Sequence, residues 1–597
     1  MFAAVLIAFL PALRNQFVDW DDTDNFVRNV HYRGLGPAEL RWMFTTFHMG
    51  HFQPLTWLTL GFDYTWARAL LGDGMDPRAY HFTNVLLHAA NAATFFFVAR
   101  GLLGRAPVGR AASPRALALA AAFASLFFGV HPLRAESVAW TTERRDLLST
   151  FFFLLAVLAY LRSRRPGAAV LGLFLLGLLS KVSVVSLPVI LLVLDWYPLG
   201  RLTRGGQLRR VLAEKIPLFA LSIAFGAVAS LGQARNHWLY TLDQHPLDAR
   251  VAQSLYGLAF YVWKTLLPAG LLPIYEMRFP VNPLEPRFVA AAPIVVVAAG
   301  ALVLLRRRVP GLVAAAMAYV IVLAPVVGIA QNGPQVVADR YSYVSCMGWA
   351  IVAAGGVLAL GARQRLRAAV VVIAAVVVAG LGALTWRQCL VWRSTASLWT
   401  YAAARAPESS IAQNGYGYVL LEAGRVAEAI PVLRRAVQIQ PSNEKANHNL
   451  WRALKESGDT DGLIAAYRES IRVLSDPADA HYNLANALMR KGEVDAAVAS
   501  YEAAIRLRPS SAPFHGALAV ALFQRGDLGG AERENRRAVE ADPALALARY
   551  NLAIVLDRLG RTAEAIEELR RALGVKPDYA EARRLLEQMT SAPSGGK

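Results

Sequence analysis

Prolines recur at a nearly constant spacing through the last third of the chain. The intervals between them are 34, 36, 32, 34 and 34 residues, at Pro407, Pro441, Pro477, Pro509, Pro543 and Pro577. A 34-residue period that closes on proline is the signature of the tetratricopeptide repeat, a helix pair that buries its apolar face against neighbouring pairs. The period therefore predicts a helical solenoid, which is an all-α architecture.

The unit at 477–509 shows why this period folds as paired helices. Small residues such as Ala485 and Ala497 let two helices approach closely, Gly492 ends the first helix, and Pro509 stops the second. We predict five repeats after a half-repeat at 397–406, followed by a capping helix at 578–590. The repeat domain thus covers residues 393–590, and residues 591–597 are predicted to form a disordered tail.

Residues 1–392 have the composition of a polytopic membrane domain. The whole chain is 55% hydrophobic, which is too apolar for one soluble core of this length. A spanning helix needs about 20 apolar residues. We predict about eleven spans, at 2–13, 80–99, 116–131, 147–161, 168–181, 183–199, 213–232, 288–305, 311–330, 345–361 and 368–388.

Basic residues are concentrated in loops between these spans. From Leu398 onward, 26 Lys and Arg oppose 25 Asp and Glu, whereas the preceding residues hold 36 against 18. The positive-inside rule places the basic loops and the N-terminus in the cytoplasm. The repeats then face outward, in the periplasm if the membrane is a bacterial inner membrane. The loops on the same outer side are 14–79, 131–146, 233–287 and 331–344. Because the repeats carry no basic face, we expect no nucleic-acid partner.

Two further apolar helices do not fit the alternation of inner and outer loops. Residues 251–268 have both flanks on the outer side, and residues 53–72 lie inside the first outer loop. An amphipathic helix lying in the outer interface reconciles this pattern. We therefore expect both segments to contact membrane lipid at the outer surface.

The first outer loop carries an acidic run, FVDWDDTDNFVRNV at 17–30. Adjacent Asp21 and Asp22 repel each other, and apolar surroundings raise the cost of ionising both. One carboxylate held near a reacting hydroxyl is able to act as a general base; the alternative is a solvated acidic loop or a helix N-cap. We expect both carboxylates to face water, so that replacement by asparagine leaves folding unchanged.

The other outer loops bring further ionisable groups close to the hydrocarbon, where such groups are functional candidates. Arginine binds a phosphate as a fork and lysine binds it as a point charge. The alternatives are a charged helix start, a snorkelling lysine and an Asp–Arg pair at a helix end. The predicted donor or phosphate-binding residues are His131, Arg134, Glu136, Arg144, Asp146, Lys181, Asp339, Arg340 and Tyr341.

The first helices of the repeats are expected to line a concave groove, which in such solenoids holds an extended peptide or a partner helix. Asparagine side chains there either bond to a peptide backbone or only satisfy the polar face. The predicted acceptor-groove residues are Asn447, Asn449, Tyr482, Asn483, Tyr550 and Asn551.

Motifs for metals and nucleotides are absent from the sequence. The histidines at 31, 48, 51, 81 and 88 fit no zinc spacing, and no phosphate-binding P-loop occurs. We expect no metal site and no required cofactor, with a divalent cation at the adjacent aspartates left open as an alternative. The two cysteines, Cys346 and Cys389, are expected to be unpaired.

Several segments together resemble the bacterial relatives of the transmembrane and tetratricopeptide-repeat protein O-mannosyltransferases. They occur in the family order and are followed by the repeats. The segments are WDDTDNFVRN (20–29), QPLTWLTLGFDY (53–64), YHFTNVLLHAAN (80–91), HPLRAESVAWTTERRDLLS (131–149), SKVSVVSLPVILLVLDWYPLGR (180–201), ADRYSYVSCMG (338–348) and TWRQCLVWRSTASLW (385–399).

The resemblance implies a C-type glycosyltransferase (GT-C) membrane fold and a polyprenyl-phosphate sugar as donor. It also implies that the acidic pair after the first helix is catalytic. One departure is Arg134, where the family usually has histidine in the H-P-L-x-x-E-S-V-A segment. That difference puts the phosphate or sugar contacts of this position in doubt.

These observations lead to one main hypothesis and two alternatives. The main hypothesis is a membrane glycosyltransferase that moves mannose or another hexose to Ser or Thr hydroxyls of proteins held by the repeats. Asp21 or Asp22 would be the base, with Arg340 and Lys181 neutralising the leaving phosphate. The alternatives are a non-catalytic scaffold for envelope complexes and a lipid-linked glycan ligase.

Overall fold

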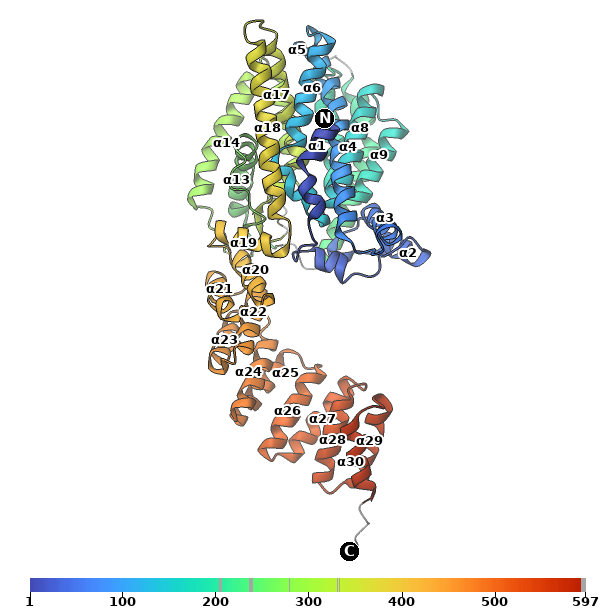
Figure 1. Ribbon diagram of the computed structural model, residues 1–597, viewed down its shortest axis with the longest axis vertical. Helices are drawn as coiled ribbons and strands as arrows, with labels where there is room; N and C mark the ends of the chain where they lie inside the picture. The colour runs from blue at the N-terminus through green and yellow to red at the C-terminus, as the bar shows by residue number, and fades with distance from the viewer. Residues whose placement is uncertain (203–206, 236–239, 279, 330, 332, 592–597) are drawn as a thin grey trace. The chain divides into compact units, whose positions relative to one another are not determined.

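The chain folds into two compact units, which divide between Ala406 and Pro407. The computed structural model in Figure 1 describes residues 1–202, 207–235, 240–278, 280–329, 331 and 333–591. The helix at 395–405, which the repeat period assigned to a half-repeat, is grouped with the first unit. The predicted disordered tail lies outside the described residues, except for Ser591 at the end of the last helix.

The first unit is almost entirely helical. Several helices begin with proline, whose fixed φ and missing N–H suit the first helical position. The helices are α1 (Phe2–Ala8), α2 (Pro37–Thr45), α3 (Pro54–Leu71), α4 (Pro77–Arg105), α5 (Pro107–Arg110), α6 (Pro114–Gly129), α7 (Ala135–Ala139), α8 (Arg144–Ser163), α9 (Ala168–Ser180), α10 (Leu187–Trp196), α11 (Leu208–Ala213), α12 (Ile216–Arg235), α13 (Leu247–Leu266), α14 (Pro286–Leu305), α15 (Pro310–Leu323), α16 (Ser342–Ser345), α17 (Met347–Gly361), α18 (Arg367–Val391) and α19 (Thr395–Arg405).

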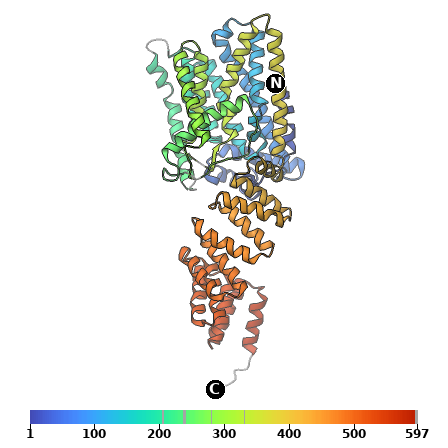
Figure 2. The ribbon, with the colours of Figure 1, turned by 90° about the vertical axis from the view of Figure 1, so that its left-hand side faces the viewer.

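The long helices of this unit run side by side, and α4 packs against α6 and α8 (Figures 1 and 2). The helices α2 and α3 lie at one end of this bundle. A two-stranded antiparallel ribbon joins β1 (Tyr275–Glu276) to β2 (Gln335–Val337). The predicted all-α fold is therefore confirmed, with this ribbon as its strand content in the described part of the chain.

The count of eleven spans is not confirmed. Among the described residues, five helices are long and apolar enough to cross a membrane, or up to seven if two bent helix pairs count as spans. The two pairs bend by 53° and 56°. The remaining expected spans fall on shorter helices, because Pro11 lies in a 3₁₀ turn after α1 and Lys181 separates α9 from the next helical segment.

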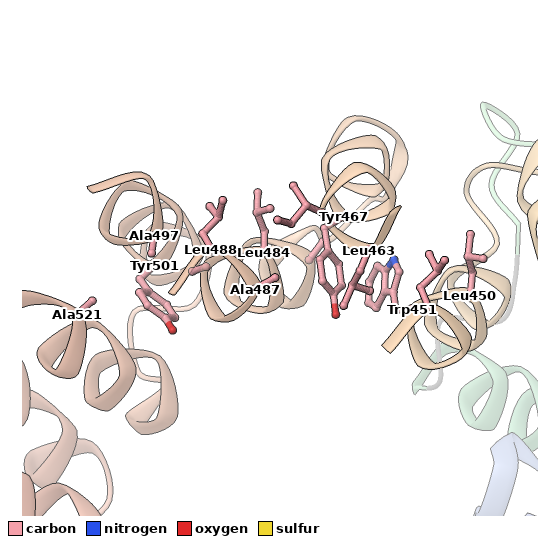
Figure 3. Packing of buried hydrophobic residues seen from close by; sticks show 14 of the residues in the cluster. Leu450, Trp451, Leu463, Tyr467, Leu484, Ala487, Leu488, Ala497, Tyr501 and Ala521 are labelled. Atoms are coloured by element: carbon pink, nitrogen blue, oxygen red, sulfur yellow. The ribbon is translucent and has the colours of Figure 1, made fainter. Parts of the chain in front are cut away.

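The second unit is the predicted array of five helix pairs and a capping helix. Each pair buries alanine and leucine between its two helices, and Figure 3 shows this core at Leu450, Leu484 and Leu488. The helices are α20 (Ser410–Glu422), α21 (Val426–Ile439), α22 (Glu444–Glu456), α23 (Thr460–Val473), α24 (Ala478–Lys491), α25 (Val494–Leu507), α26 (Ala512–Arg525), α27 (Leu528–Ala541), α28 (Ala546–Arg558), α29 (Thr562–Val575) and α30 (Ala580–Ser591).

The periodic prolines have a second role besides stopping helices. Asn447 donates to the carbonyl of Pro441 at 2.8 Å, and His515 bonds to that of Pro509 at 2.8 Å. The same six-residue relation recurs as Gln413 to Pro407, Arg549 to Pro543 and Arg583 to Pro577. A backbone carbonyl group in a turn needs a hydrogen-bond donor when it is removed from water. A side chain from the first helix of each of these repeats therefore forms a hydrogen bond with the proline carbonyl in the preceding turn.

Candidate active site

Asp22 is the most constrained residue of the acidic loop. Its Oδ1 accepts hydrogen bonds from the hydroxyl of Thr142 at 2.6 Å and from the backbone N–H of Thr142 at 3.1 Å. Its Oδ2 accepts from the backbone N–H of Val18 at 3.0 Å. Asn25 donates in turn to the Thr142 hydroxyl at 3.3 Å. The acidic loop is thus tied to Thr142 through the Asp22 carboxylate and the Asn25 amide.

This geometry corrects the expectation that both aspartates face water. The side chain of Asp22 is fully buried, whereas Asp21 is partly exposed. Burial raises the pKa of Asp22 to about 7, although its hydrogen bonds with Thr142 and Val18 oppose the rise. An asparagine at this position would turn an amide NH₂ toward a backbone N–H, so its replacement is not neutral for the local structure.

Asp21 is the more accessible member of the acidic pair. Its carboxylate interacts electrostatically with Asp22 and with Arg145 on α8. A base must reach the hydroxyl that it deprotonates. Of the two aspartates, the partly exposed Asp21 meets this requirement.

Glu143 is the centre of a charge network beside this loop. Its buried carboxylate lies 3.0 Å from the Arg145 guanidinium and 3.0 Å from the Lys181 ammonium. The Arg340 guanidinium lies 3.6 Å from the same carboxylate. One carboxylate therefore holds cations from α8, from the start of the segment after α9 and from the 3₁₀ turn Asp339–Tyr341.

Two further carboxylates complete this network. Glu136 accepts a hydrogen bond from the backbone N–H of Arg340 at 2.8 Å and pairs with its guanidinium. Asp146 lies 2.7 Å from the Lys181 ammonium. The three cations remain partly accessible, with side-chain exposures of 11% for Arg145, 20% for Lys181 and 14% for Arg340. The structure thus brings together four residues predicted for donor binding: Glu136, Asp146, Lys181 and Arg340.

Arg144 does not join this network, which corrects its assignment to phosphate binding. Its guanidinium forms a salt bridge with Asp63 at 2.7 Å, and both side chains have 0% exposure. It also donates to the carbonyl of Tyr80 at 2.7 Å and bonds to Asn84. Arg144 therefore joins α8 to α3 and α4 inside the protein.

His131 and Arg134 also lie inside the unit. His131 bonds to the carbonyl of Thr265 at 3.1 Å and accepts from the N–H of Leu133 at 3.3 Å, so it caps a short turn. The Arg134 guanidinium lies over the rings of Phe128 and Tyr343, 5.3 and 5.6 Å from their centres. Both residues are nearly fully buried, so neither presents its polar group to a surface-bound phosphate.

Asp339 and Tyr341 flank Arg340 and hold its turn. Asp339 is buried and accepts a hydrogen bond from the Tyr275 hydroxyl at 3.0 Å. The Tyr341 hydroxyl accepts from Gln335 at 2.8 Å, and its ring lies 5.1 Å from the Arg340 guanidinium carbon. These two residues therefore position Arg340 relative to β1 and β2.

The predicted donor-binding residues did not include Thr142, Glu143 or Arg145, although Glu143 and Arg145 lie in the same segment of ionisable functional candidates. Helix spacing does not separate Arg144 from Arg145, because Arg144 precedes the buried Leu147 and Leu148 by three and four residues and Arg145 precedes Leu148 by three. No local pattern marks Thr142, whose role depends on a partner 120 residues away.

The predicted groove residues in the repeats have different environments. Asn447 is only 2% exposed, and its amide bonds to Pro441, Asn443 and Ser470. This corrects its assignment to a peptide groove, since its amide is committed to internal contacts. The other five are partly exposed: Asn449, Tyr482, Asn483, Tyr550 and Asn551.

Asn449 and Tyr482 already have side-chain partners on neighbouring repeats. Asn449 donates to Asn414 of the preceding repeat at 2.8 Å. The Tyr482 ring stacks on Phe514 of the next repeat, with ring centres 4.8 Å apart. These contacts join successive first helices of the array.

In the described part of the chain, no group of three or more His, Cys, Asp or Glu side chains has the arrangement of a metal site. Both cysteines are buried and free, which confirms that they are unpaired. The requirement for a divalent cation stays a prediction.

Comparisons with known proteins identify the repeat array directly. Tetratricopeptide-repeat family models match residues 393–444, 450–512, 482–546 and 522–589. Among solved structures, YrrB, a TPR protein with an unusual peptide-binding site, is 19% identical with a TM-score of 0.28 and covers 31% of this chain and 96% of its own. MamA is 19% identical with a TM-score of 0.26, over 28% of this chain and 96% of its own.

Curated relatives are protein O-mannosyl-transferases. Human TMTC3 is 32% identical over 120 residues, which is 20% of this chain and 11% of the relative. Human TMTC4 is 31% identical over 179 residues, or 28% and 23% of the two chains. Mouse TMTC2 is 29% identical over 223 residues, or 33% and 25%. The matched stretches thus cover at most a quarter of these relatives. The chain therefore has a C-terminal tetratricopeptide-repeat array and several helices long and apolar enough to cross a membrane, and over the matched stretches it is similar to the TMTC protein O-mannosyl-transferases.

Proposed function

We propose that this protein is a membrane glycosyltransferase that moves a hexose, with mannose the first choice, from a polyprenyl phosphate to Ser or Thr hydroxyls of proteins. The observation that carries the proposal is the meeting of Arg145, Lys181 and Arg340 around Glu143, beside the partly exposed Asp21. The names of the relatives support the same class of reaction.

Asp21 is the general base in this proposal. It accepts the proton of the acceptor hydroxyl while that oxygen attacks the anomeric carbon of the donor. The new glycosidic C–O bond forms as the bond from the anomeric carbon to the phosphate oxygen breaks. Polyprenyl phosphate leaves with the electron pair, and a single displacement inverts the configuration. Asp22 holds the loop through Thr142 and does not contact the substrate.

The cations of the network stabilise the leaving phosphate. Fixed charges that are placed where negative charge develops need little reorganisation during the reaction. Arg340 supplies a planar fork and Lys181 a point charge, and both keep part of their surface accessible. Glu143 holds these cations close together in spite of their mutual repulsion. A donor phosphate that binds here interacts with the same cations that pair with Glu136 and Asp146.

In this proposal the repeat array binds the acceptor polypeptide. An acceptor bound in its groove reaches a high local concentration near the membrane unit to which the array is linked. Asn449, Asn483 and Asn551 occupy corresponding places on α22, α24 and α28 and are partly exposed. We place the reaction on the outer face of a bacterial inner membrane, with the N-terminus in the cytoplasm, as the loop charges indicate.

Mass spectrometry of envelope proteins tests the proposal. Cells would carry the wild-type chain, the Asp21→Asn variant, the Asp24→Asn variant or neither chain. Asp24 is a matched control, because it lies on the same loop and pairs with the exposed Arg28 at 2.9 Å. We expect hexose on Ser or Thr with wild type and Asp24→Asn, and its loss with Asp21→Asn. Identical protein glycosylation in all four strains would overturn the proposal in favour of a scaffold or a glycan ligase.

A further inference from the structure

Residues 393–399, which follow α18, form hydrogen bonds with the backbone just before the acidic pair. The carbonyl of Arg393 accepts a hydrogen bond from the N–H of Gln16 at 2.9 Å. The hydroxyl of Thr395 accepts one from the N–H of Asp19 at 2.8 Å, and the indole N–H of Trp399 donates to the carbonyl of Asp19 at 3.3 Å. Three contacts therefore fix residues 16–19 to residues 393–399, all within the first unit.

Tryptophan rings reinforce these backbone contacts. Trp20 stacks on Trp399 with ring centres 4.9 Å apart and planes 10° from parallel. Trp20 and Trp140 form a T-shaped pair with centres 6.1 Å apart, and Trp140 stacks on Trp392 at 5.6 Å. Trp20 immediately precedes Asp21, so a fixed Trp20 ring limits the directions in which the next side chain points.

The helix α19 has an unusual position for the start of a repeat array. The sequence of residues 393–444 matches the tetratricopeptide repeat. Its Trp399 is nevertheless buried and contacts Trp20 and Asp19, and the Tyr401 hydroxyl donates to the carbonyl of Leu271 at 3.0 Å, all in the first unit. The helix α19 therefore makes these contacts within the membrane unit, although its sequence belongs to the repeat period.

We propose that Trp399 is a positioning residue for the candidate catalytic loop: through Trp20 and the backbone of Asp19, α19 sets the direction of the Asp21 carboxylate. The inference rests on the proposed function for its effect on catalysis. The structural part, that α19 immobilises residues 15–27, is testable without any transfer reaction.

Hydrogen–deuterium exchange on the purified full-length protein tests this structural part. The variants are Trp399→Ala, which removes the stack and the indole N–H, and Thr395→Val, which removes only the acceptor for Asp19. A matched control is Trp386→Ala on α18, because Trp386 is 42% exposed. We expect about tenfold faster exchange in residues 15–27 for Trp399→Ala, a smaller change for Thr395→Val and none for Trp386→Ala.

Steady-state transfer from undecaprenyl-phosphate mannose to an envelope protein extract tests the catalytic part. Trp399→Ala should lower kcat about tenfold and leave the KM for the donor unchanged, and Trp399→Phe, which keeps an aromatic ring, should recover part of kcat. Unchanged exchange in residues 15–27, or exchange that rises throughout the first unit, would overturn the inference. Faster local exchange with no transfer by the wild type would instead support the role of α19 and contradict the proposed function.

Discussion

Asp22 and Thr142 are joined twice, once through the Thr142 hydroxyl at 2.6 Å and once through its backbone N–H at 3.1 Å. Short hydrogen bonds to a carboxylate are stronger than those between neutral groups. Because Thr142 immediately precedes Glu143, this link also sets the distance between the acidic loop and the charge network. The proposed base and the proposed phosphate site are therefore parts of one connected structure.

Replacement of Thr142 by valine should loosen that connection. Valine has a similar shape but lacks the hydroxyl, so Asp22 keeps its two backbone donors and loses its shortest bond. A hydrogen bond to a charged group contributes about 1.5–3 kcal/mol. We expect the initial rate of sugar transfer to fall by about tenfold or more. The Thr142→Ser variant keeps the hydroxyl and should stay near wild type; equal losses in both variants would contradict this explanation.

The raised pKa of Asp22 predicts a pH dependence of stability. Its pKa in the folded protein is about 7, above its ordinary value of 3.8, so the protonated carboxyl favours the folded state. That contribution is complete below 3.8 and is lost as the pH rises through about 7.

Thermal unfolding of the detergent-solubilised wild type and Asp22→Asn protein measures this effect. The difference in Tm, wild type minus variant, should decrease between about pH 4 and pH 7 and level off above it, because asparagine does not titrate. Other ionisable groups cancel in the difference. A difference that increases over this range would mean that the folded-state pKa of Asp22 is depressed.

The repeat array was predictable from the sequence for a physical reason. The array consists of local helix pairs, so the spacing from Pro407 to Pro577 and the glycines such as Gly492 report its structure directly. The first unit depends on contacts between distant segments. The pairing of Glu136 with Arg340 joins residues 204 positions apart, and no local pattern indicates it.

The number of spans and the direction of buried charges were harder to predict for the same reason. Hydropathy finds apolar runs but does not detect breaks within them, such as the 3₁₀ segment Val182–Ser186. Burial of Asp22 and Arg144 depends on Thr142 and Asp63, each contributed by another segment. The sequence therefore identified candidate charged residues along the chain, whereas their partners depend on three-dimensional contacts.

Glu143 should contribute more to stability than its neighbour Asp146. Glu143 is fully buried and faces three cations, whereas Asp146 pairs with Lys181 at the edge of the network. Loss of one partner from a buried ion pair costs about 3–5 kcal/mol. We expect Glu143→Gln to lower Tm markedly and Asp146→Asn to lower it less. An equal effect of the two variants would show that Glu143 is not the centre of the network.

Arg144 should affect folding and not donor binding. The Arg144→Met variant leaves Asp63 buried without its cation, which should cost about 3–5 kcal/mol. The double variant Arg144→Met/Asp63→Leu removes both charges and should recover part of that loss. Protein that still folds should keep the wild-type KM for the donor. A normal Tm together with a raised KM would restore Arg144 as a phosphate ligand.

The repeats contain a titratable contact of their own. His515 bonds to Glu534 at 2.6 Å and to the carbonyl of Pro509 at 2.8 Å. The hydrogen bond to Glu534 raises the pKa of His515 above its ordinary 6.5, so this contact stabilises the array most below 6.5. The stabilisation is lost as the pH rises through the folded-state pKa of the histidine.

The His515→Asn variant isolates this titration, because Asn447 in an earlier repeat makes the same bond to a proline carbonyl without titrating. Hydrogen–deuterium exchange of α26 and α27, corrected for intrinsic exchange rates, measures local stability in the full chain. Protection should decline with rising pH in the wild type and stay constant in the variant. A parallel decline in both proteins would assign the pH dependence to other groups, since only the wild type carries an imidazole at this position.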